Sequence, residues 1–134
     1  MLQQMRKLIL ALLTCLVAVP VLAQDGLKPG DTISGRLRFF RHQHPNETTW
    51  IDVYQIVADH PRKFAEDDEF CDPDNPPKTF HLVVMGDRAK KRQLDRMLGK
   101  TVSVVIEAFH CSETAWHVGD AVVFNWHFPE RNRR

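Results

Sequence analysis

The chain has 134 residues and a formal net charge of +1, with 26% charged and 43% hydrophobic residues. A charge this close to zero excludes a globally basic protein, so nothing in the composition predicts binding to nucleic acid. After residues 1–23, about 110 residues remain, which is enough for one domain with a modest hydrophobic core.

Residues 1–23 have the pattern of a secretory signal peptide. Arg6 and Lys7 form a positive start, and an apolar run follows over residues 8–19. This run is too short to span a bilayer comfortably, so we expect cleavage before Gln24 and no membrane span afterwards. The product is then expected in the bacterial periplasm or outside the cell. The alternative is an uncleaved membrane anchor.

Residues 24–134 are expected to form a single domain with a basic C-terminal tail, acting as a monomer without a cofactor. The charges of this part are segregated: residues 66–74 carry six acids and no base, whereas residues 88–100 carry six bases. Runs of this kind usually form solvated faces.

Cys71 and Cys111 are the two cysteines that follow the signal peptide. An even pair in an exported protein predicts a disulfide bond. The bond would close a loop of about 40 residues and contribute roughly 4 kcal/mol in the chain-entropy model. The alternative is that both thiolates bind a metal ion together with nearby histidines.

Alternation of apolar and polar residues predicts five strands, with one helix between the third and the fourth. In chain order we expect strands at residues 32–40, 50–58 and 79–85, a helix at 87–99, and strands at 101–109 and 121–128. Asp87 can accept hydrogen bonds from the first turn of the helix. Gly99 supplies the left-handed residue that commonly ends a helix.

This order of elements is that of the OB-fold. The predicted fold class is therefore mainly β: a five-stranded OB-like Greek-key barrel with one helix between strands 3 and 4. The cysteines agree with this topology, because strands 2 and 4 run the same way and Cys71 and Cys111 follow their ends. The alternative is a small open sheet with one packed helix.

The carboxy-terminal half has a recognisable order of an apolar strand, a helix, Leu-Gly-Lys-x-Val, a histidine-containing loop and a final strand. The residues that carry it are Leu98-Gly99-Lys100-Thr101-Val102-Ser103-Val104, Ala108-Phe109, His117 and Val122-Val123. The order resembles that of a family of small exported bacterial domains of unknown function. The resemblance implies an OB-like barrel and no particular activity. In that family the last loop tends to hold several consecutive histidines, whereas this chain has Trp116-His117-Val118 there.

The candidate binding residues are aromatic and histidine side chains near strands 2 and 3. OB barrels bind ligands on the face of these strands, framed by the loops between strands 1 and 2 and strands 4 and 5. Ile51, Val53 and Val57 are expected to point inward. The candidates are Trp50 and Tyr54, both expected to point outward, His81, Trp116 and His117. Rings with a polar handle suit contacts with sugars, bases or proteins. The alternative is that these rings pack beneath the 59–78 loop.

Three histidines are candidate metal ligands. His42 and His44 alternate along an extended loop and can point the same way, and His117 offers a third nitrogen. The two loops are expected to leave opposite ends of the barrel, so the alternative is that these histidines are simply solvated.

The sequence contains no catalytic or phosphate-binding motif, so we do not expect an enzyme. The preferred interpretation is a non-catalytic periplasmic binding module for a protein or envelope glycan partner. One alternative is an immunity or inhibitor protein that neutralises a toxin or hydrolase with its acidic 66–74 run. A second alternative is a metal-binding periplasmic protein.

Overall fold

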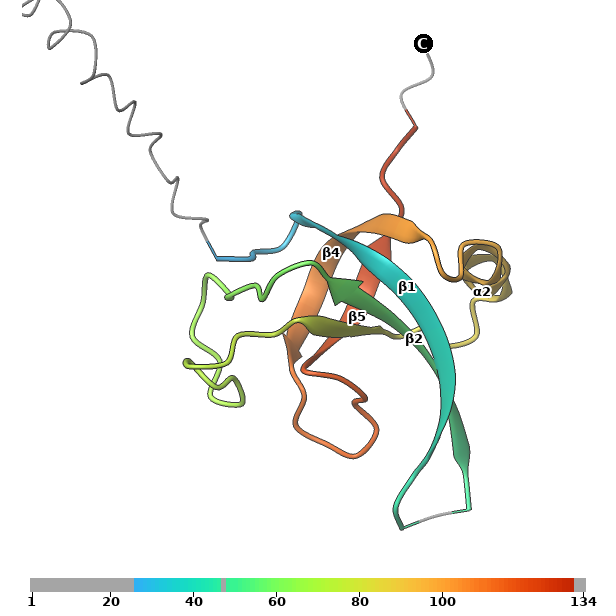
Figure 1. Cartoon of the computed structure of the whole chain (residues 1–134), viewed down its shortest axis with the longest axis horizontal. Coiled ribbons are helices and arrows are strands. Elements are labelled where there is room, and N and C mark those ends of the chain that lie inside the picture. Colours follow the sequence, from blue (N-terminus) through green and yellow to red (C-terminus); the bar gives the residue numbers. More distant parts are fainter. Residues whose placement is uncertain (1–25, 47, 132–134) are drawn as a thin grey trace, which may run out of the picture.

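Each segment of alternating residues forms a strand, and the basic segment between the third and fourth forms a helix (Figure 1). The computed structural model describes residues 26–46 and 48–131, so the predicted signal peptide and the end of the tail lie outside the described residues. The elements are β1 (Thr32–Gln43), β2 (Trp50–Ala58), β3 (Thr79–Leu82), α2 (Arg88–Asp95), β4 (Thr101–Cys111) and β5 (Ala121–His127).

The strands close into a barrel in the order β1-β2-β3-β5-β4, with β4 pairing back to β1. Four of the five pairings are antiparallel, and the pairing of β3 with β5 is parallel. The predicted class, an OB-like Greek-key barrel with one helix between β3 and β4, is confirmed.

Side chains from all five strands fill the barrel, as expected for a ring of this size. The buried core includes Ile33, Leu37, Ile56, Phe80, Leu82, Val104, Ile106, Val123 and Trp126. The Trp126 indole N–H donates to the carbonyl oxygen of Val83 over 2.9 Å, so the largest core residue has no unpaired polar atom.

Helix α2 closes one side of the barrel, and in Figure 1 the 59–78 segment lies on the opposite side. The carboxylate of Asp87 accepts from the backbone N–H of Lys90 over 2.9 Å, which confirms the predicted cap. Leu94 is fully buried in the core. The α-helix ends at Asp95, and Gly99 follows after a further turn with φ of +76°.

The prediction that Tyr54 points outward is wrong, whereas Val53 is buried and Trp50 is exposed, as predicted. Tyr54 belongs to the core with Ile56 and is only 2% exposed. Its hydroxyl donates to Asp95 Oδ1 over 2.5 Å and accepts from Lys91 Nζ over 2.8 Å. The alternation misleads because Gln55, on the other face, is buried as well. With both faces covered, polarity no longer marks the inward side.

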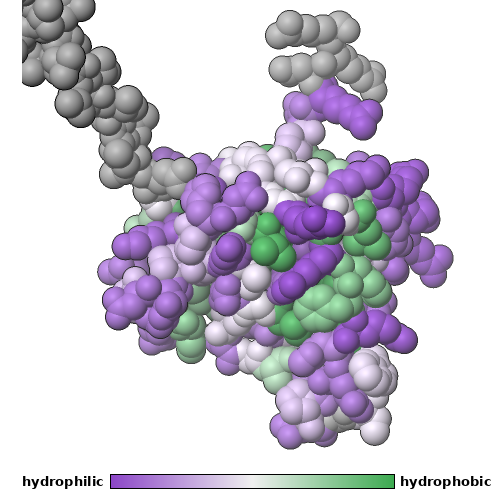
Figure 2. All heavy atoms as spheres, viewed as in Figure 1, coloured by the Kyte–Doolittle hydropathy of each residue, from purple (hydrophilic) through white to green (hydrophobic). Residues whose placement is uncertain are grey.

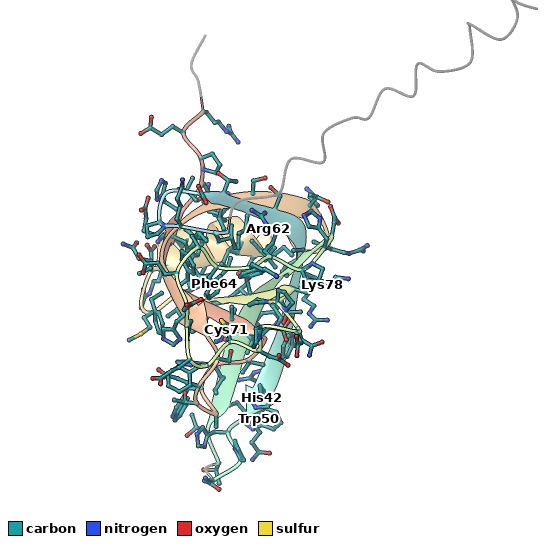
Figure 3. All side chains as sticks on the ribbon, turned by 90° about the vertical axis from the view of Figure 1, so that its left-hand side faces the viewer. His42, Trp50, Arg62, Phe64, Cys71 and Lys78 are labelled. Carbon is teal, nitrogen blue, oxygen red and sulfur yellow. A yellow bond between two sulfur atoms is a disulfide. The ribbon has the colours of Figure 1, made fainter. Side chains whose placement is uncertain are left out.

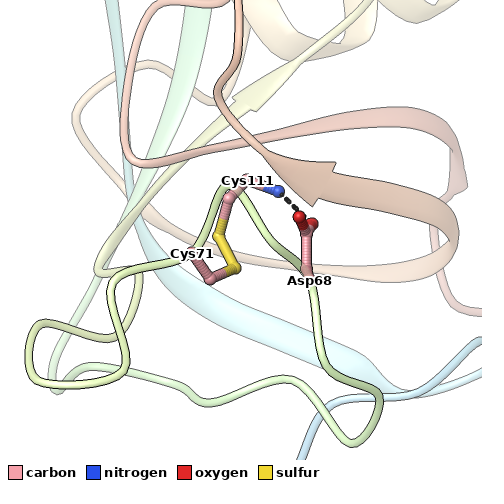
Figure 4. A group of neighbouring side chains, drawn as sticks. All are labelled: Asp68, Cys71 and Cys111. Carbon is pink, nitrogen blue, oxygen red and sulfur yellow. Dashed lines mark hydrogen bonds between the residues drawn. A yellow bond between two sulfur atoms is a disulfide. The ribbon is translucent and has the colours of Figure 1, made fainter.

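The predicted disulfide between Cys71 and Cys111 is present and fixes the 59–78 segment to the end of β4 (Figure 4). The two Cα atoms are 5.2 Å apart. Beside the bond, the carboxylate of Asp68 accepts from the Cys111 backbone N–H over 2.9 Å. Because the sulfurs are bonded to each other, they are not thiolate metal ligands in this structure.

Hydrophilic side chains cover most of the face seen in Figure 2, with hydrophobic side chains gathered in a smaller area near β1 and α2. No helix in the described ranges has the length and apolar character needed to cross a membrane.

Candidate functional site

The loop between β4 and β5, residues 112–120, is hydrogen-bonded to the outer face of β2 and β3; we call it the β4–β5 loop. The Gln55 amide donates to the carbonyl oxygen of Val118 over 2.8 Å. The backbone N–H of Val118 donates to His81 Nδ1 over 3.2 Å. This loop therefore contacts the buried polar groups of the face.

His81 is buried beneath this loop in its neutral form. Burial, and to a lesser degree the nearby His117, lowers the pKa of His81 from 6.5 to about 4. Because Nδ1 accepts the Val118 N–H, the ring proton lies on Nε2. Protonation of Nδ1 would break the bond that holds the loop.

The end of the loop is fixed by the close approach of Gly119 to Gln55 and by the carboxylate of Asp120. A Cβ added to Gly119 would lie 2.7 Å from the Gln55 amide nitrogen, and the φ of Gly119 is +141°. Asp120 accepts from the backbone N–H groups of Lys78 and Thr79, over 3.0 and 2.9 Å. Burial alone would raise the pKa of Asp120, but these hydrogen bonds outweigh it and the pKa is lowered.

A groove of about 470 Å³ lies between the β4–β5 loop, the strands β2 and β3, and α2. Its exposed apolar walls are Met85, Trp116 and Phe124, which are 88%, 44% and 44% exposed. Asp52 and Lys91 contribute opposite charges to the lining. We call this cavity the β2–β3 groove.

The β2–β3 groove brings together four of the five candidate binding residues: His81, Trp116, His117 and, from the core side, Tyr54. Trp50 is 54% exposed but is not among the lining residues. It lies near the end of the β1–β2 hairpin beside His42, away from Cys71 (Figure 3).

The three predicted metal ligands are not gathered in one place. His42 lies on β1 opposite Ile51, whereas the ring of His44 stacks on Trp116 with centroids 4.2 Å apart. This stacking shows that the β1–β2 and β4–β5 loops meet, although they were expected at opposite ends. Three or more potential ligand atoms approach within 4.8 Å of one another at two places in the described residues, and neither includes His42 or His44.

One of these two places is the disulfide with Asp68, and the other consists of His110, Glu113 and His117. His110 Nε2 lies 3.6 Å from Glu113 Oε1, and the two imidazole rings have centroids 5.2 Å apart. Burial lowers the pKa of His117, His110 lowers it further, and Glu113 partly opposes this. Both imidazoles also contact the ring of Phe124.

Sequence reasoning missed His110, Glu113 and Phe124. The pairing of β4 with β5 has register shifts on both sides of Ala108, so the faces exchange after Ile106. Phe109 consequently packs against the core, which leaves His110 on the outer face. The only available signal was the short spacing His110-x₂-Glu113-x₃-His117.

No family model, curated protein or solved structure matches the chain.

Proposed function

We propose that the protein is a non-catalytic binding module of the bacterial periplasm, which holds a protein or envelope glycan partner in the β2–β3 groove. The observation that carries the proposal is the groove itself, which lies on the face that OB barrels use for ligands.

The lining of the groove suits recognition. Trp116 and Phe124 offer rigid aromatic surface with few rotatable bonds, and Met85 can adapt to the shape of a partner. Asp52 and Lys91 add charges of opposite sign, which can fix the orientation of a partner.

The buried histidine of the groove is engaged in holding the loop. The unprotonated nitrogen of His81 accepts the Val118 N–H, so it is not free to take a proton from a substrate. This arrangement favours binding over acid–base catalysis.

The test uses the chain without its signal segment as immobilised bait for envelope extract, followed by identification of what it captures. Phe124→Ala and Trp116→Ala should each weaken binding of the captured molecule by about 1–3 kcal/mol if these rings are anchors. Phe70→Ala is the matched control, because Phe70 is 50% exposed but does not line the groove. Loss of binding only in Phe70→Ala would contradict the proposal.

A second candidate function, an inhibitor of a toxin or hydrolase, is favoured by the way the acidic run is held. The run is fixed by the disulfide at Cys71 and by a bridge between Leu27 and Phe64. Glu66, Asp67 and other acids of the run are exposed and line a cavity of about 550 Å³. Fixed charges of this kind bind a basic partner without an ordering cost.

The two candidates respond to different variants. If the acidic run is the binding surface, Glu66→Gln combined with Asp67→Gln should weaken binding of the captured partner. Phe124→Ala should then have no effect. The reverse pattern supports the groove.

A further inference from the structure

We infer that His110, Glu113 and His117 form a binding site for a divalent transition metal, with zinc as the expected occupant. This goes beyond the proposed function, because it assigns a ligand to residues of the β4–β5 region that does not depend on any partner.

The three side chains already have nearly the spacing that a metal needs. One potential ligand atom from each lies within 4.8 Å of the others, and His110 Nε2 is 3.6 Å from Glu113 Oε1. Ligand atoms about 2.0–2.2 Å from a tetrahedral zinc ion are separated by roughly 3.3–3.6 Å. The remaining closure is a small adjustment of side chains that are partly exposed.

His110 is already oriented as a metal ligand. Its Nδ1 donates to the backbone carbonyl oxygen of Cys111 over 2.6 Å, which places the lone pair on Nε2, the atom that faces Glu113. Metal-binding histidines usually make such a bond through their second nitrogen, because it fixes the tautomer and the direction of the ring. The disulfide at Cys111 anchors this part of the backbone.

His117 can join the site at small cost. Its Nδ1 accepts from the backbone N–H of Glu113 over 3.3 Å, a long bond of little strength. A metal on Nδ1 would displace the Glu113 N–H, and a metal on Nε2 would require the ring proton to lie on Nδ1. This bond is therefore lost in either case. The ring of Phe124, with centroids 4.8 Å from His110 and 5.6 Å from His117, provides an apolar wall on which both imidazoles rest.

The polar network of this turn is also incomplete within the protein. Ser112 lies between His110 and Glu113 in the chain. Its hydroxyl is buried and has no hydrogen-bond partner among the described residues. Buried polar atoms in this state are uncommon and require an explanation.

The donor set selects the class of metal. Two imidazoles and one carboxylate suit zinc and copper, whereas magnesium and calcium prefer oxygen ligands alone. Three protein ligands leave at least one coordination position for water or another ligand. His117 and Phe124 also line the β2–β3 groove, so the metal would lie at its edge.

The test is calorimetric titration of the disulfide-bonded chain, purified without an affinity tag and stripped with a chelator, using zinc, copper and magnesium chlorides separately. We expect one zinc ion per chain, also copper binding, and no magnesium binding. His110→Gln and His117→Gln should each weaken zinc binding by roughly a hundredfold or more, exceeding the 10–100-fold typical of losing an outer partner. Cobalt substitution should give the visible absorption of a tetrahedral site, which both variants should lose.

His127→Gln is the matched control, because His127 Nδ1 lies 4.0 Å from Glu107 but this pair has no second histidine. It should bind zinc as the parent chain does. Circular dichroism and metal-free melting should show that all variants are folded. The inference is overturned if the parent chain binds no zinc, or if His110→Gln and His117→Gln bind it with unchanged affinity.

Discussion

The side of the barrel closed by α2 and the face covered by the β4–β5 loop are held by different kinds of contact. Leu94 and Tyr54 bury apolar surface beneath the helix, and Lys90 Nζ donates to the carbonyl oxygen of Trp126 over 2.6 Å. Over the opposite surface of β2 and β3, Gln55 and His81 hold the loop through hydrogen bonds to its backbone.

The packed side beneath α2 should contribute mainly to stability, and the side covered by the loop should contribute mainly to binding. Packed apolar surface stabilises in proportion to the area buried and does not depend on pH. A loop held by a few hydrogen bonds is less strongly fixed, and binding loops are drawn from such parts of a structure. We therefore expect changes beneath α2 to alter unfolding most, and changes of the exposed groove side chains Trp116 and Phe124 to alter binding.

The largest expected effect is that of Tyr54→Ala. It would remove a buried ring from the core together with its bonds to Asp95 and Lys91. The free energy of unfolding should fall by about 3–5 kcal/mol, as for other buried aromatic residues. Urea unfolding measures this, with Tyr54→Phe as the milder control that retains the ring. Unfolding at the parental urea concentration would show that Tyr54 is not a core residue.

The next effect is a pH dependence that originates at His81. Its pKa is about 4 when folded, from an ordinary value of 6.5, so between these values the unfolded chain binds a proton that the folded chain does not. The contribution of His81 to the free energy of unfolding is therefore complete above pH 6.5. It falls by about 3 kcal/mol as the pH is lowered to 4. His117, which contributes to lowering the pKa of His81, itself has a lowered pKa because burial and the nearby His110 disfavour its charged form.

The measurement is urea unfolding with chelator present at several pH values, for the parent chain and for His81→Gln. Glutamine keeps an acceptor for the Val118 N–H but does not titrate. The difference in unfolding free energy between the two proteins should change across this pH range. A constant difference would show that His81 is not held neutral in the folded state.

Replacing Gln55 should have a smaller effect. Gln55→Leu keeps the bulk but removes the donor to Val118 and the acceptor for Arg38, which are 2.8 and 2.6 Å away. The loss should be about 1–3 kcal/mol, since the partly buried carbonyl group of Val118 is left unpaired. Hydrogen exchange should show faster opening of residues 112–120, whereas the amides of α2 should be unchanged. Equal acceleration in both regions would remove the distinction between them.

The sequence predicts the barrel well because apolar and polar residues alternate along each strand wherever one face is exposed to solvent. In β4, Val102, Val104 and Ile106 are buried as their spacing predicts. The prediction fails at two positions, for two different reasons. Tyr54 is misplaced because β2 is covered on both faces, and Ala108 is exposed because the register shifts beside it exchange the faces of β4.

The candidate site was only partly predictable for the same reason. Trp116 and His117 could be placed near the ligand face from the order of the elements alone. Grouping His110 with Glu113 and His117 required the position of the register shifts and the path of the β4–β5 loop. Neither leaves a clear pattern in the sequence.

The smallest effect on stability is expected for Phe124→Ala. Phe124 is 44% exposed and lies outside the buried core. Its removal should change the free energy of unfolding by no more than about 0.5 kcal/mol, as is usual for surface substitutions. Thermal melting checks this on the same sample that is used for binding. A drop as large as that of Tyr54→Ala would place Phe124 in the core and remove it from the binding surface.

The central claim, that the β2–β3 groove is the binding surface, is tested most directly by a two-dimensional amide NMR titration. The isotopically labelled chain is titrated with the molecule captured from envelope extract. The shifted amides should cluster at residues 51–52, 81–85 and 112–124, while those of α2 beyond Lys91 and of residues 66–74 should stay unchanged. Shifts confined to residues 66–74, with the groove unaffected, would contradict it.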